Sequence, residues 1–401
     1  MKFGDFAEIN PKVLLPKDSV VSFVEMADLT PGIKYVKPSY EKALKGSCSK
    51  FCDRDTLFSR ITPCLQNGKI SQVIDLKNGK GFGSTEFFVF RGKDGVSTSD
   101  FIFYLAQSEM IKEPAIRSMV GASGRQRADL DVIRNIEIPP ISIRNQNKIT
   151  NVLSNYDDLI EKNNNRISIL ESIGKHLYSE WFVKFNYVGA SKKFDRKERR
   201  ESPIGPIPEG WTIKSAQEAI LINPKTKLDK KTENPFVGMS GLSENSMVIS
   251  DVIHKKGNSG AKFINGDTLF ARITPCLQNG KTGYVQFLTD EQPVGFGSTE
   301  FIVLRESEDL SSEYIYLLSR SNSFREHAIQ SMTGATGRQR VHNDCFASLY
   351  IAVPPRELMD EFSKLVSPMF KSIFNLSMRN ENLKKQRDML LPKLISGEIA
   401  L

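Results

Sequence analysis

The sequence contains no long hydrophobic run. No stretch approaches the roughly 18 consecutive apolar residues that a membrane-spanning helix requires. The first ten residues, MKFGDFAEIN, carry acidic side chains where a secretory signal peptide has an apolar segment. These two absences predict a cytoplasmic protein with no membrane partner.

Cysteine and histidine are few and scattered. The five cysteines are Cys48, Cys52, Cys64, Cys276 and Cys345, and the four histidines are His176, His254, His327 and His342. The cysteines form no CxxC pair, and no histidine has the spacing of a zinc ligand set. We therefore expect reduced thiols, no disulfide framework and no metal.

Motifs for cofactors and catalysis are also missing. The GFG triplet in residues 81–87 leads into a strand-like run, so no helix amino terminus follows it to hold a phosphate. Gly280, Lys281 and Thr282 resemble the end of a phosphate-binding loop, but Pro275 occupies the position of its required upstream glycine. No Asp/Asn-Pro-Pro-aromatic methyltransferase motif and no clear cluster of nuclease carboxylates is present. We predict no cofactor and no catalytic activity for the chain alone.

The charge balance is mildly basic. The 401 residues include 55 Lys and Arg against 47 Asp and Glu, which gives a formal net charge of +8. This excess favours a polyanionic partner without requiring one. The length suits two or three domains.

One domain occurs twice in the chain. Matching segments recur at an offset of 212 to 215 residues: TLFSRITPCLQNGK (56–69) and TLFARITPCLQNGK (268–281), GFGSTEF (81–87 and 295–301), SMVGASGRQR (118–127) and SMTGATGRQR (331–340), INPK (9–12 and 222–225), and the Pro-Pro pairs at 139–140 and 354–355. The period is far longer than that of a solenoid repeat, so each copy is long enough to have its own core.

Each copy has the pattern of a mixed α/β domain. The apolar runs 86–90 and 300–304 are bounded by glycine and charge, which predicts buried strands. Residues 101–119 and 314–332, which follow them, have helical spacing. The fold class is therefore α/β mixed (α+β), with two repeated globular domains.

A long segment with heptad spacing follows each Pro-Pro pair. Nearly all of its a and d positions are apolar. These positions are Ile149, Leu153, Tyr156, Ile160, Asn163, Ile167, Leu170, Gly174, Leu177 and Trp181 in the first segment, and Phe362, Val366, Met369, Ile373, Leu376, Asn380, Leu383, Arg387, Leu390 and Leu394 in the second. This spacing is typical of a coiled coil. Pro368 should kink the second helix or mark a later start for it.

These patterns divide the chain into five parts. We expect globular domains at residues 1–140 and 211–355, long spacer helices at 141–187 and 356–401, and a charged, then Pro-Gly-rich linker at 188–210.

A polar loop ending in Arg-Gln-Arg occurs in both copies. Its candidate DNA-contacting residues are Arg125, Gln126 and Arg127 in the first copy and Arg338, Gln339 and Arg340 in the second. Arginine can pair bidentately with guanine and glutamine with adenine, and small neighbours keep the loop narrow enough for a groove. The alternative is a solvated turn with ordinary surface charges.

The repeated CLQNGK segment supplies a second set of candidates. They are Gln66, Asn67 and Lys69, matched by Gln278, Asn279 and Lys281. Asn-Gly also suits a tight turn, so turn and DNA contact remain equally open. Arg60 and Arg272 either touch phosphate or pair with a local acid.

The carboxyl-terminal string RDMLLPKLISGEI (387–399), LYSEWFVKF (177–185) and IPEGW (207–211) resemble segments of the specificity subunits of type I restriction-modification systems. The resemblance covers essentially the whole chain. The first copy departs from the pattern, because it has no counterpart of IPEGW.

The resemblance implies a non-catalytic, DNA-binding subunit. Its two target-recognition domains would each read half of a bipartite site in double-stranded DNA, and two antiparallel helices would set the gap with pseudo-twofold symmetry. Two modification (methyltransferase) subunits would dock on the helices, and restriction (motor/nuclease) subunits would join through them. A coiled-coil scaffold with repeated protein-binding domains is the alternative.

Two further expectations concern the helix register and the DNA site. In an antiparallel pair whose residue numbers sum to about 543, Asn163 and Asn380 share one layer and favour one register, with Ile149 near Leu394 and Trp181 near Phe362. Similar recognition domains related by a twofold axis predict similar half-sites in inverted orientation.

Overall fold

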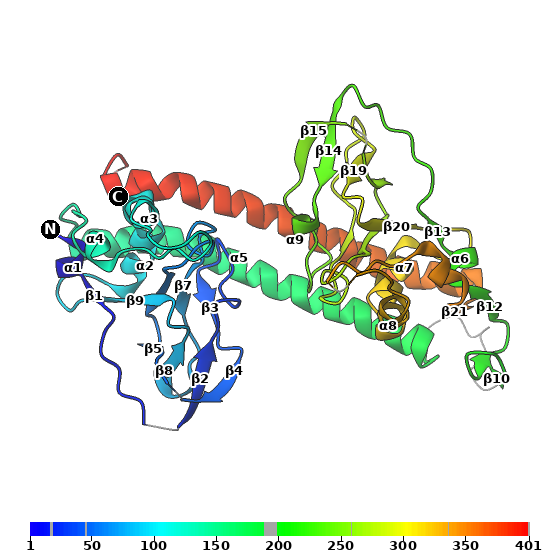
Figure 1. Ribbon diagram of the computed structural model, residues 1–401, viewed down its shortest axis with the longest axis horizontal. Coiled ribbons are helices and arrows are strands. Elements are labelled where there is room, and N and C mark those ends of the chain that lie inside the picture. The colour runs from blue at the N-terminus through cyan, green and yellow to red at the C-terminus, as the bar shows by residue number, and fades with distance from the viewer. Residues whose placement is uncertain (17–18, 45, 188–198, 258, 336, 400–401) are drawn as a thin grey trace. The chain divides into compact units, whose positions relative to one another are not determined.

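The computed structural model describes residues 1–16, 19–44, 46–187, 199–257, 259–335 and 337–399 (Figure 1). The chain divides into unit 1, formed by Met1–Asn163 and Arg379–Leu401, and unit 2, formed by Asn164–Met378. Both units mix helices and sheets, as the sequence predicted. Of the expected linker, residues 188–198 lie outside the described residues. No described helix combines the length and hydropathy of a membrane span.

Unit 1 contains two sheets. One has the order β1 (Ala7–Ile9), β9 (Phe87–Gly92), β6 (Thr56–Ser59), β7 (Ile70–Val73) and β3 (Tyr35–Val36). The other has the order β4 (Tyr40–Ala43), β2 (Val20–Val24), β8 (Lys80–Gly83) and β5 (Ser49–Cys52). Every residue of β6 and β7 is buried, including the polar side chains of Thr56, Ser59, Ser71 and Gln72. The predicted strand at 86–90 is β9.

Short helices cover the first sheet of unit 1. They are α1 (Phe3–Phe6), α2 (Ser99–Gln107), α3 (Glu109–Arg117) and α4 (Leu130–Arg134), with a 3-10 turn, η1, at Lys77–Gly79. The helical spacing over 101–119 belongs to two helices, because Ser108 between them has extended backbone angles. Thr98 caps α2 by accepting a hydrogen bond from the Phe101 amide.

Unit 2 repeats this plan with small changes. One sheet has the order β13 (Leu221–Ile222), β20 (Phe301–Arg305), β17 (Thr268–Ala271) and β18 (Thr282–Tyr284). The other has the order β15 (Ile253–Lys256), β14 (Glu233–Val237), β19 (Gly295–Gly297) and β16 (Lys262–Phe263). Two further strand pairs are β10 (Arg199–Arg200) with β11 (Ile207–Pro208), and β12 (Thr212–Ser215) with β21 (Tyr350–Val353).

The helices of unit 2 also correspond to those of unit 1. They are α6 (Ala216–Ala219), α7 (Ser312–Ser319) and α8 (Asn322–Gln330), with 3-10 turns η3 at Met239–Gly241 and η4 at Asn343–Ala347. Ser215 and Glu218 form a reciprocal capping box at α6, which fixes the start of this short helix.

The same buried ion pair ties the central strands together in each unit. Arg91 of β9 donates two hydrogen bonds of 2.7 Å to Asp55, beside β6. Arg305 of β20 donates bonds of 2.7 and 2.8 Å to Asp267, beside β17. Burial raises the pKa of both carboxyls, and the bidentate arginines oppose that shift.

The edge of unit 1 that lacks an IPEGW counterpart is paired by the first residues of the chain. Ile138 donates its amide hydrogen to the Met1 carbonyl at 2.7 Å, and Phe3 donates to Ile136 at 2.8 Å. In unit 2, β12 and β21 pair over four residues in the corresponding place. The first copy therefore closes this edge with fewer backbone bonds.

Two long helices contribute residues to both units. Helix α5 spans Ile143–Tyr178 and continues as a π-helical turn, η2, at Ser179–Val183, and α9 spans Arg356–Ser396. Pro368 lies inside α9, so the expectation of a later helix start is wrong. Phe362 and Phe370 are buried on either side of this proline, and their packing holds the helix through the position that lacks an amide donor.

Within unit 1, α5 and α9 pack side by side in opposite directions. Ile149 lies in the same apolar cluster as Leu394. Fourteen residues further along α5, Asn163 donates a buried hydrogen bond of 2.8 Å to Asn380, fourteen residues earlier in α9. The two asparagines thus meet in one layer, as the seam pattern predicted.

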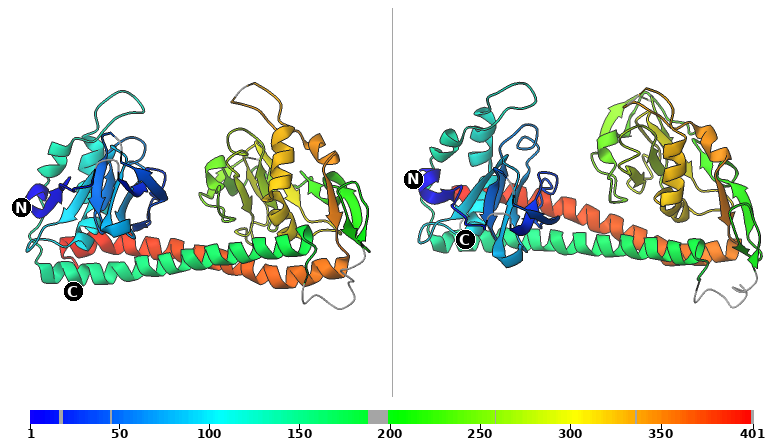
Figure 2. Two further views of the ribbon diagram at one scale, coloured as in Figure 1. Left: turned by 90° about the horizontal axis from the view of Figure 1, so that it is seen from below. Right: turned by 60° about the horizontal axis from the view of Figure 1, so that its bottom comes forward.

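Within unit 2, the helices again run antiparallel. The Trp181 and Phe362 rings are 5.8 Å apart between centroids, which confirms the predicted neighbours. The Phe370 ring faces Gly174, where an added Cβ would lie 3.8 Å from Phe370 Cε1. In each unit by itself, Figure 2 shows the sheets and short helices on one side of the helix pair.

Candidate functional site

The Arg-Gln-Arg triplet of each unit forms an edge against the segment that precedes the CLQNGK turn. In unit 1, the Gln126 amide donates to the Thr62 hydroxyl at 3.0 Å, and the Thr62 amide donates to the Gln126 carbonyl at 2.9 Å. In unit 2, Gln339 and Thr274 form the same two bonds, both at 3.0 Å. The two motifs, 64 residues apart in unit 1, are therefore neighbours.

A glutamate holds the second arginine of each triplet. In unit 1, Glu86 accepts hydrogen bonds from Arg127 Nε at 2.9 and 3.1 Å and from its terminal nitrogen at 2.5 Å. In unit 2, Glu300 accepts the equivalent bonds from Arg340 at 2.9, 3.0 and 2.7 Å. The fork of each arginine is thus occupied within its own unit.

These ion pairs shift the titration of the glutamates. Hydrogen bonding from Arg127 lowers the pKa of Glu86, and hydrogen bonding from Arg340 lowers the pKa of Glu300. Both carboxylates are therefore charged at neutral pH, so each arginine remains neutralised.

Both arginines of each triplet are exposed, but only the second one is paired with a glutamate. Arg125 and Arg338 lie in tight turns, with their amides donating to Ala122 and Ala335 at 2.9 Å. Among the described residues, neither side chain makes a hydrogen bond or an ion pair. In each unit, Figure 2 shows the loop at the edge away from the helix pair. Arg125 and Arg338 can therefore reach an outside partner.

Arg60 and Arg272 lie beside these loops in equivalent positions. Arg60 Nε is 3.4 Å from Glu86 without a hydrogen bond, and its guanidinium lies 5.1 Å from the Phe88 ring centroid. Arg272 Nε is also buried and has no hydrogen-bond partner among the described residues. Both side chains remain partly exposed. Each arginine therefore lies near a local acid, Glu86 or Glu300, and keeps an Nε donor without a hydrogen bond. Contact of either arginine with phosphate stays a prediction.

The lysines of the CLQNGK turns bind backbone within their own units. Lys69 Nζ donates to the Met26 carbonyl at 2.8 Å, and Lys281 Nζ donates to the Met239 carbonyl at 3.1 Å. Both are half-buried. These contacts favour the turn interpretation for the lysines.

The polar residues of the same turns are exposed. Gln66 and Asn67 in unit 1 and Gln278 and Asn279 in unit 2 all face solvent. Asn279 donates to Glu244 at 3.0 Å, and Asn67 makes no equivalent side-chain hydrogen bond among the described residues. The following glycines have positive φ angles of 72° and 84°, which is the backbone reason for Asn-Gly there.

The sequence interpretation did not identify Glu86 and Glu300 as part of the loops. Both belong to the repeated GFGSTEF motif, in which they are the charged residues. That retained charge beside a buried strand was the available signal. In the described part of the chain, no three His, Cys, Asp or Glu side chains gather as a metal-binding group.

Comparison with known proteins identifies one family. Residues 1–172 match the family model of the type I restriction modification DNA specificity domain. Over 317 residues the chain is 26% identical to the type I restriction enzyme MjaIX specificity subunit of Methanocaldococcus jannaschii, covering 77% of this chain and 70% of that protein. It is 23% identical over 441 residues to the HindI specificity subunit of Haemophilus influenzae, covering 94% of each.

A solved structure supports the fold. The S subunit of a type I restriction-modification system from M. genitalium aligns with a TM-score of 0.53 at 12% identity, over 98% of this chain and 95% of that one. This likeness concerns the fold alone. Together with the matched specificity domain, these relatives confirm the resemblance found in the sequence, which is to the specificity subunits of type I restriction-modification systems.

Proposed function

We propose that this chain is the DNA-recognition subunit of a type I restriction-modification complex and that it reads a bipartite site. Residues 1–140 and 211–355 act as target-recognition domains, residues 141–187 and 356–401 as antiparallel spacer helices, and 188–210 as the linker. The helices set the gap between half-sites and dock two modification subunits, through which restriction subunits join. Catalysis belongs to those subunits and not to this chain.

The observation that carries this proposal is the Arg-Gln-Arg loop built in the same way twice. In each unit, one arginine is held by a glutamate and the preceding arginine is exposed on a narrow, glycine-flanked turn. An exposed arginine on a narrow loop can enter the major groove and bind guanine bidentately. Arg125 and Arg338 are therefore the proposed base-reading residues, and Arg127 and Arg340 are the proposed supports of the loop.

The likeness of the two loops extends the proposal to the DNA sequence. Two similar reading surfaces on an approximately twofold subunit select similar half-sites in inverted orientation. Segments 42–54 and 245–266 differ between the copies, so one or two bases can depart from symmetry. Mapping the methylated bases in DNA from cells carrying this system tests this directly, and two unrelated half-sites would contradict it.

Loop variants test the assignment of residues. In complexes with modification subunits, Arg125→Ala should weaken binding at one half-site, and Arg338→Ala at the other, by about 1 to 3 kcal/mol. Arg117→Ala, an exposed arginine on α3, is the matched control. Equal affinity of all variants for cognate duplex would overturn the base-reading role. No mobility shift of any duplex, with or without modification subunits, would instead support a protein-binding scaffold.

A further inference from the structure

Each unit contains an open basic cleft in an equivalent position. Their cavity volumes are about 430 Å³ in unit 1 and about 440 Å³ in unit 2. Corresponding lining residues are Asn10, Lys12, Lys50, Arg60, Thr85 and Val89 in the first cleft and Asn223, Lys225, Lys262, Arg272, Thr299 and Val303 in the second. Both clefts therefore combine two lysines, one arginine and a threonine hydroxyl.

The repeated INPK motif positions the first lysine of each cleft. Asn10 has a φ of 51° and both donates to and accepts from the Val89 backbone, at 2.7 and 2.9 Å. Asn223 has a φ of 48° and makes the same two bonds to Val303, both at 2.8 Å. Asparagine tolerates this left-handed conformation better than most residues. The asparagine thus anchors the chain so that the lysine two residues later lines the cleft.

The second lysine is present in both copies although its surroundings differ. Lys50 and Lys262 lie in segments 42–54 and 245–266, which have little sequence in common apart from a shared Lys-Phe pair. The phenylalanine of each pair is fully buried and fixes the strand, and the lysine beside it is partly exposed. The structure therefore repeats the position of this cation on two otherwise dissimilar strands.

The cations of the clefts lack enough partners to neutralise them. Among the described residues, Lys12, Lys50, Lys225 and Lys262 have no ion pair. The nearest carboxylate to Arg60 is Glu86, which Arg127 already occupies. In each cleft, the arginine also has a buried Nε without a hydrogen bond. An anionic ligand is the missing complement.

We propose that each cleft binds a backbone phosphate of DNA beside the half-site that its loop reads. This inference rests on the proposed DNA recognition. Lysines supply point charges that suit a phosphate, and arginine supplies directed donors. Glu86 and Glu300 link each cleft to its loop, since each contacts the loop arginine and lies beside the cleft arginine. The cleft would orient the duplex, and the loop would select its bases.

The salt dependence of DNA affinity tests the clefts. Two double variants of the full chain, each in complex with the modification subunits, remove the lysines of one cleft. One variant is Lys12→Gln with Lys50→Gln, and the other is Lys225→Gln with Lys262→Gln. Each double variant should lower the slope of log affinity against log salt by about 0.9, the value for one lost phosphate contact. The affinity for cognate and for unrelated duplexes should fall by the same factor. Lys77→Gln and Lys256→Gln, which remove exposed lysines outside the clefts, should leave the slope unchanged.

Two further measurements identify the source of the phosphate. A methylphosphonate replaces one charged phosphate of the duplex at a time. The substitution should lower the affinity of the wild type at one position per half-site and should leave the affinity of the double variant unchanged at that position. Lys→Arg replacements at the same positions should restore the slope. If inorganic phosphate protects the wild type from unfolding while the DNA slope is unchanged in the variants, the cleft binds free anions and the proposal is wrong. Absence of any duplex binding by the wild type would refute DNA recognition itself.

Discussion

Tyr104 of α2 in unit 1 and Tyr316 of α7 in unit 2 lie in corresponding helices but one position out of register, because Tyr104 matches Leu317 at the local offset of 213 residues. The two tyrosines meet different neighbours at the long helices. The Tyr104 hydroxyl donates to Asp157 of α5 at 2.5 Å. The Tyr316 ring packs edge-on against Phe370 of α9, with centroids 5.6 Å apart. The corresponding helices therefore meet the long helices through a polar tyrosine contact in one unit and an aromatic tyrosine contact in the other.

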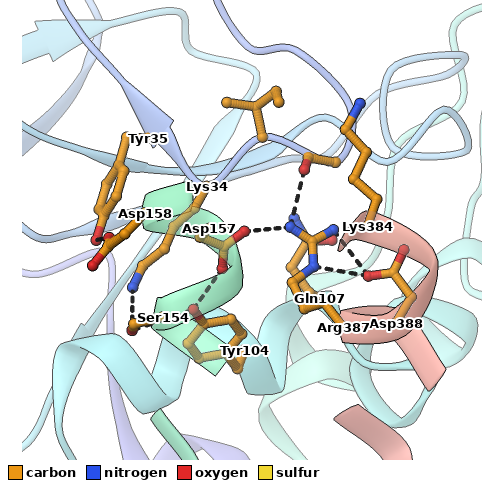
Figure 3. Close-up of polar contacts among 12 residues, drawn as sticks. Lys34, Tyr35, Tyr104, Gln107, Ser154, Asp157, Asp158, Lys384, Arg387 and Asp388 are labelled. Carbon is orange, nitrogen blue, oxygen red and sulfur yellow. Dashed lines mark hydrogen bonds and ion pairs between the residues drawn. The ribbon is translucent and has the colours of Figure 1, made fainter. Parts of the chain in front are cut away.

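The junction of unit 1 is a buried polar network (Figure 3). Asp157 pairs with Arg387 of α9, and Arg387 also donates to the Gly32 carbonyl at 3.0 Å. Lys34 donates to Ser154 at 3.1 Å. Burial raises the pKa of Asp157 and lowers the pKa of Lys34, which shows how strongly this site opposes isolated charge. The network depends on every partner being present.

The junction of unit 2 is aromatic. Phe370 contacts both Tyr284 and Tyr316 edge-on, and the Phe182 ring contacts Tyr314 and Phe362 in the same way. Such contacts are less directional than ion pairs. The comparison teaches that the repeated domain keeps its outer loop while its attachment to the helices changes. In the proposed function the outer loop faces DNA and the helix junction does not, so the two surfaces are under different constraints.

The largest effect is expected from Arg387→Ala. Removing this guanidinium leaves the Asp157 carboxylate buried without its main partner and should cost about 3 to 5 kcal/mol of unfolding free energy. Both tryptophans lie in unit 2, so circular dichroism should detect the loss more strongly than tryptophan fluorescence. Arg379→Ala, exposed on the same helix, is the control. A loss below about 1 kcal/mol would contradict the importance of this pair.

The tyrosines of the two corresponding helices test this comparison. Tyr104→Phe removes a buried hydrogen bond to a carboxylate and should cost about 1.5 to 3 kcal/mol. Tyr316→Phe keeps its ring contacts and should change stability by less than about 0.5 kcal/mol. Denaturant unfolding of the two variants measures the difference. Equal losses would mean that the two junctions are not energetically distinct.

A smaller effect is expected at the asparagine pair. Asn163→Leu removes the buried hydrogen bond to Asn380 and should cost about 1 kcal/mol. Replacing both asparagines with leucine should recover that loss and permit alternative registers. Denaturant midpoints give the stability, and engineered cross-links along α5 and α9 give the register. A single register in the double variant would assign the specificity to other contacts.

The smallest effect is expected at the glutamates of the loops. Because the folded-state pKa of Glu86 and Glu300 is lowered, their ion pairs stabilise the fold above the ordinary carboxyl pKa, about 4.5. That contribution is lost as the pH falls through the lowered values. The difference in melting temperature between wild type and Glu86→Gln or Glu300→Gln should therefore shrink between about pH 5 and pH 3. The two variants should show the same pH response, in contrast to the different junctions of the two units. A pH response for only one of the two glutamates would mean that the loops are not energetically equivalent.

The sequence by itself determined the duplicated domain, the central strands and the pairing layer of the two asparagines. These features depend on repetition and period, which are visible along one dimension. Thus the positions of Asn163 and Asn380 in their seams were sufficient to predict their contact. The expectation that Pro368 marks a later helix start failed because local helix preference was outweighed by buried aromatic residues on both sides.

Only the tertiary structure decided which charged side chains are free. Arg125 and Arg127 look equivalent in the sequence and both are exposed, but Glu86, 41 residues from Arg127, pairs with Arg127 and leaves Arg125 without an ion pair among the described residues. Lys69 likewise bonds to Met26, 43 residues away. The basic clefts combine four separate segments in the same way. The partner of a side chain is set by the strands that folding brings together, and no local pattern records that choice.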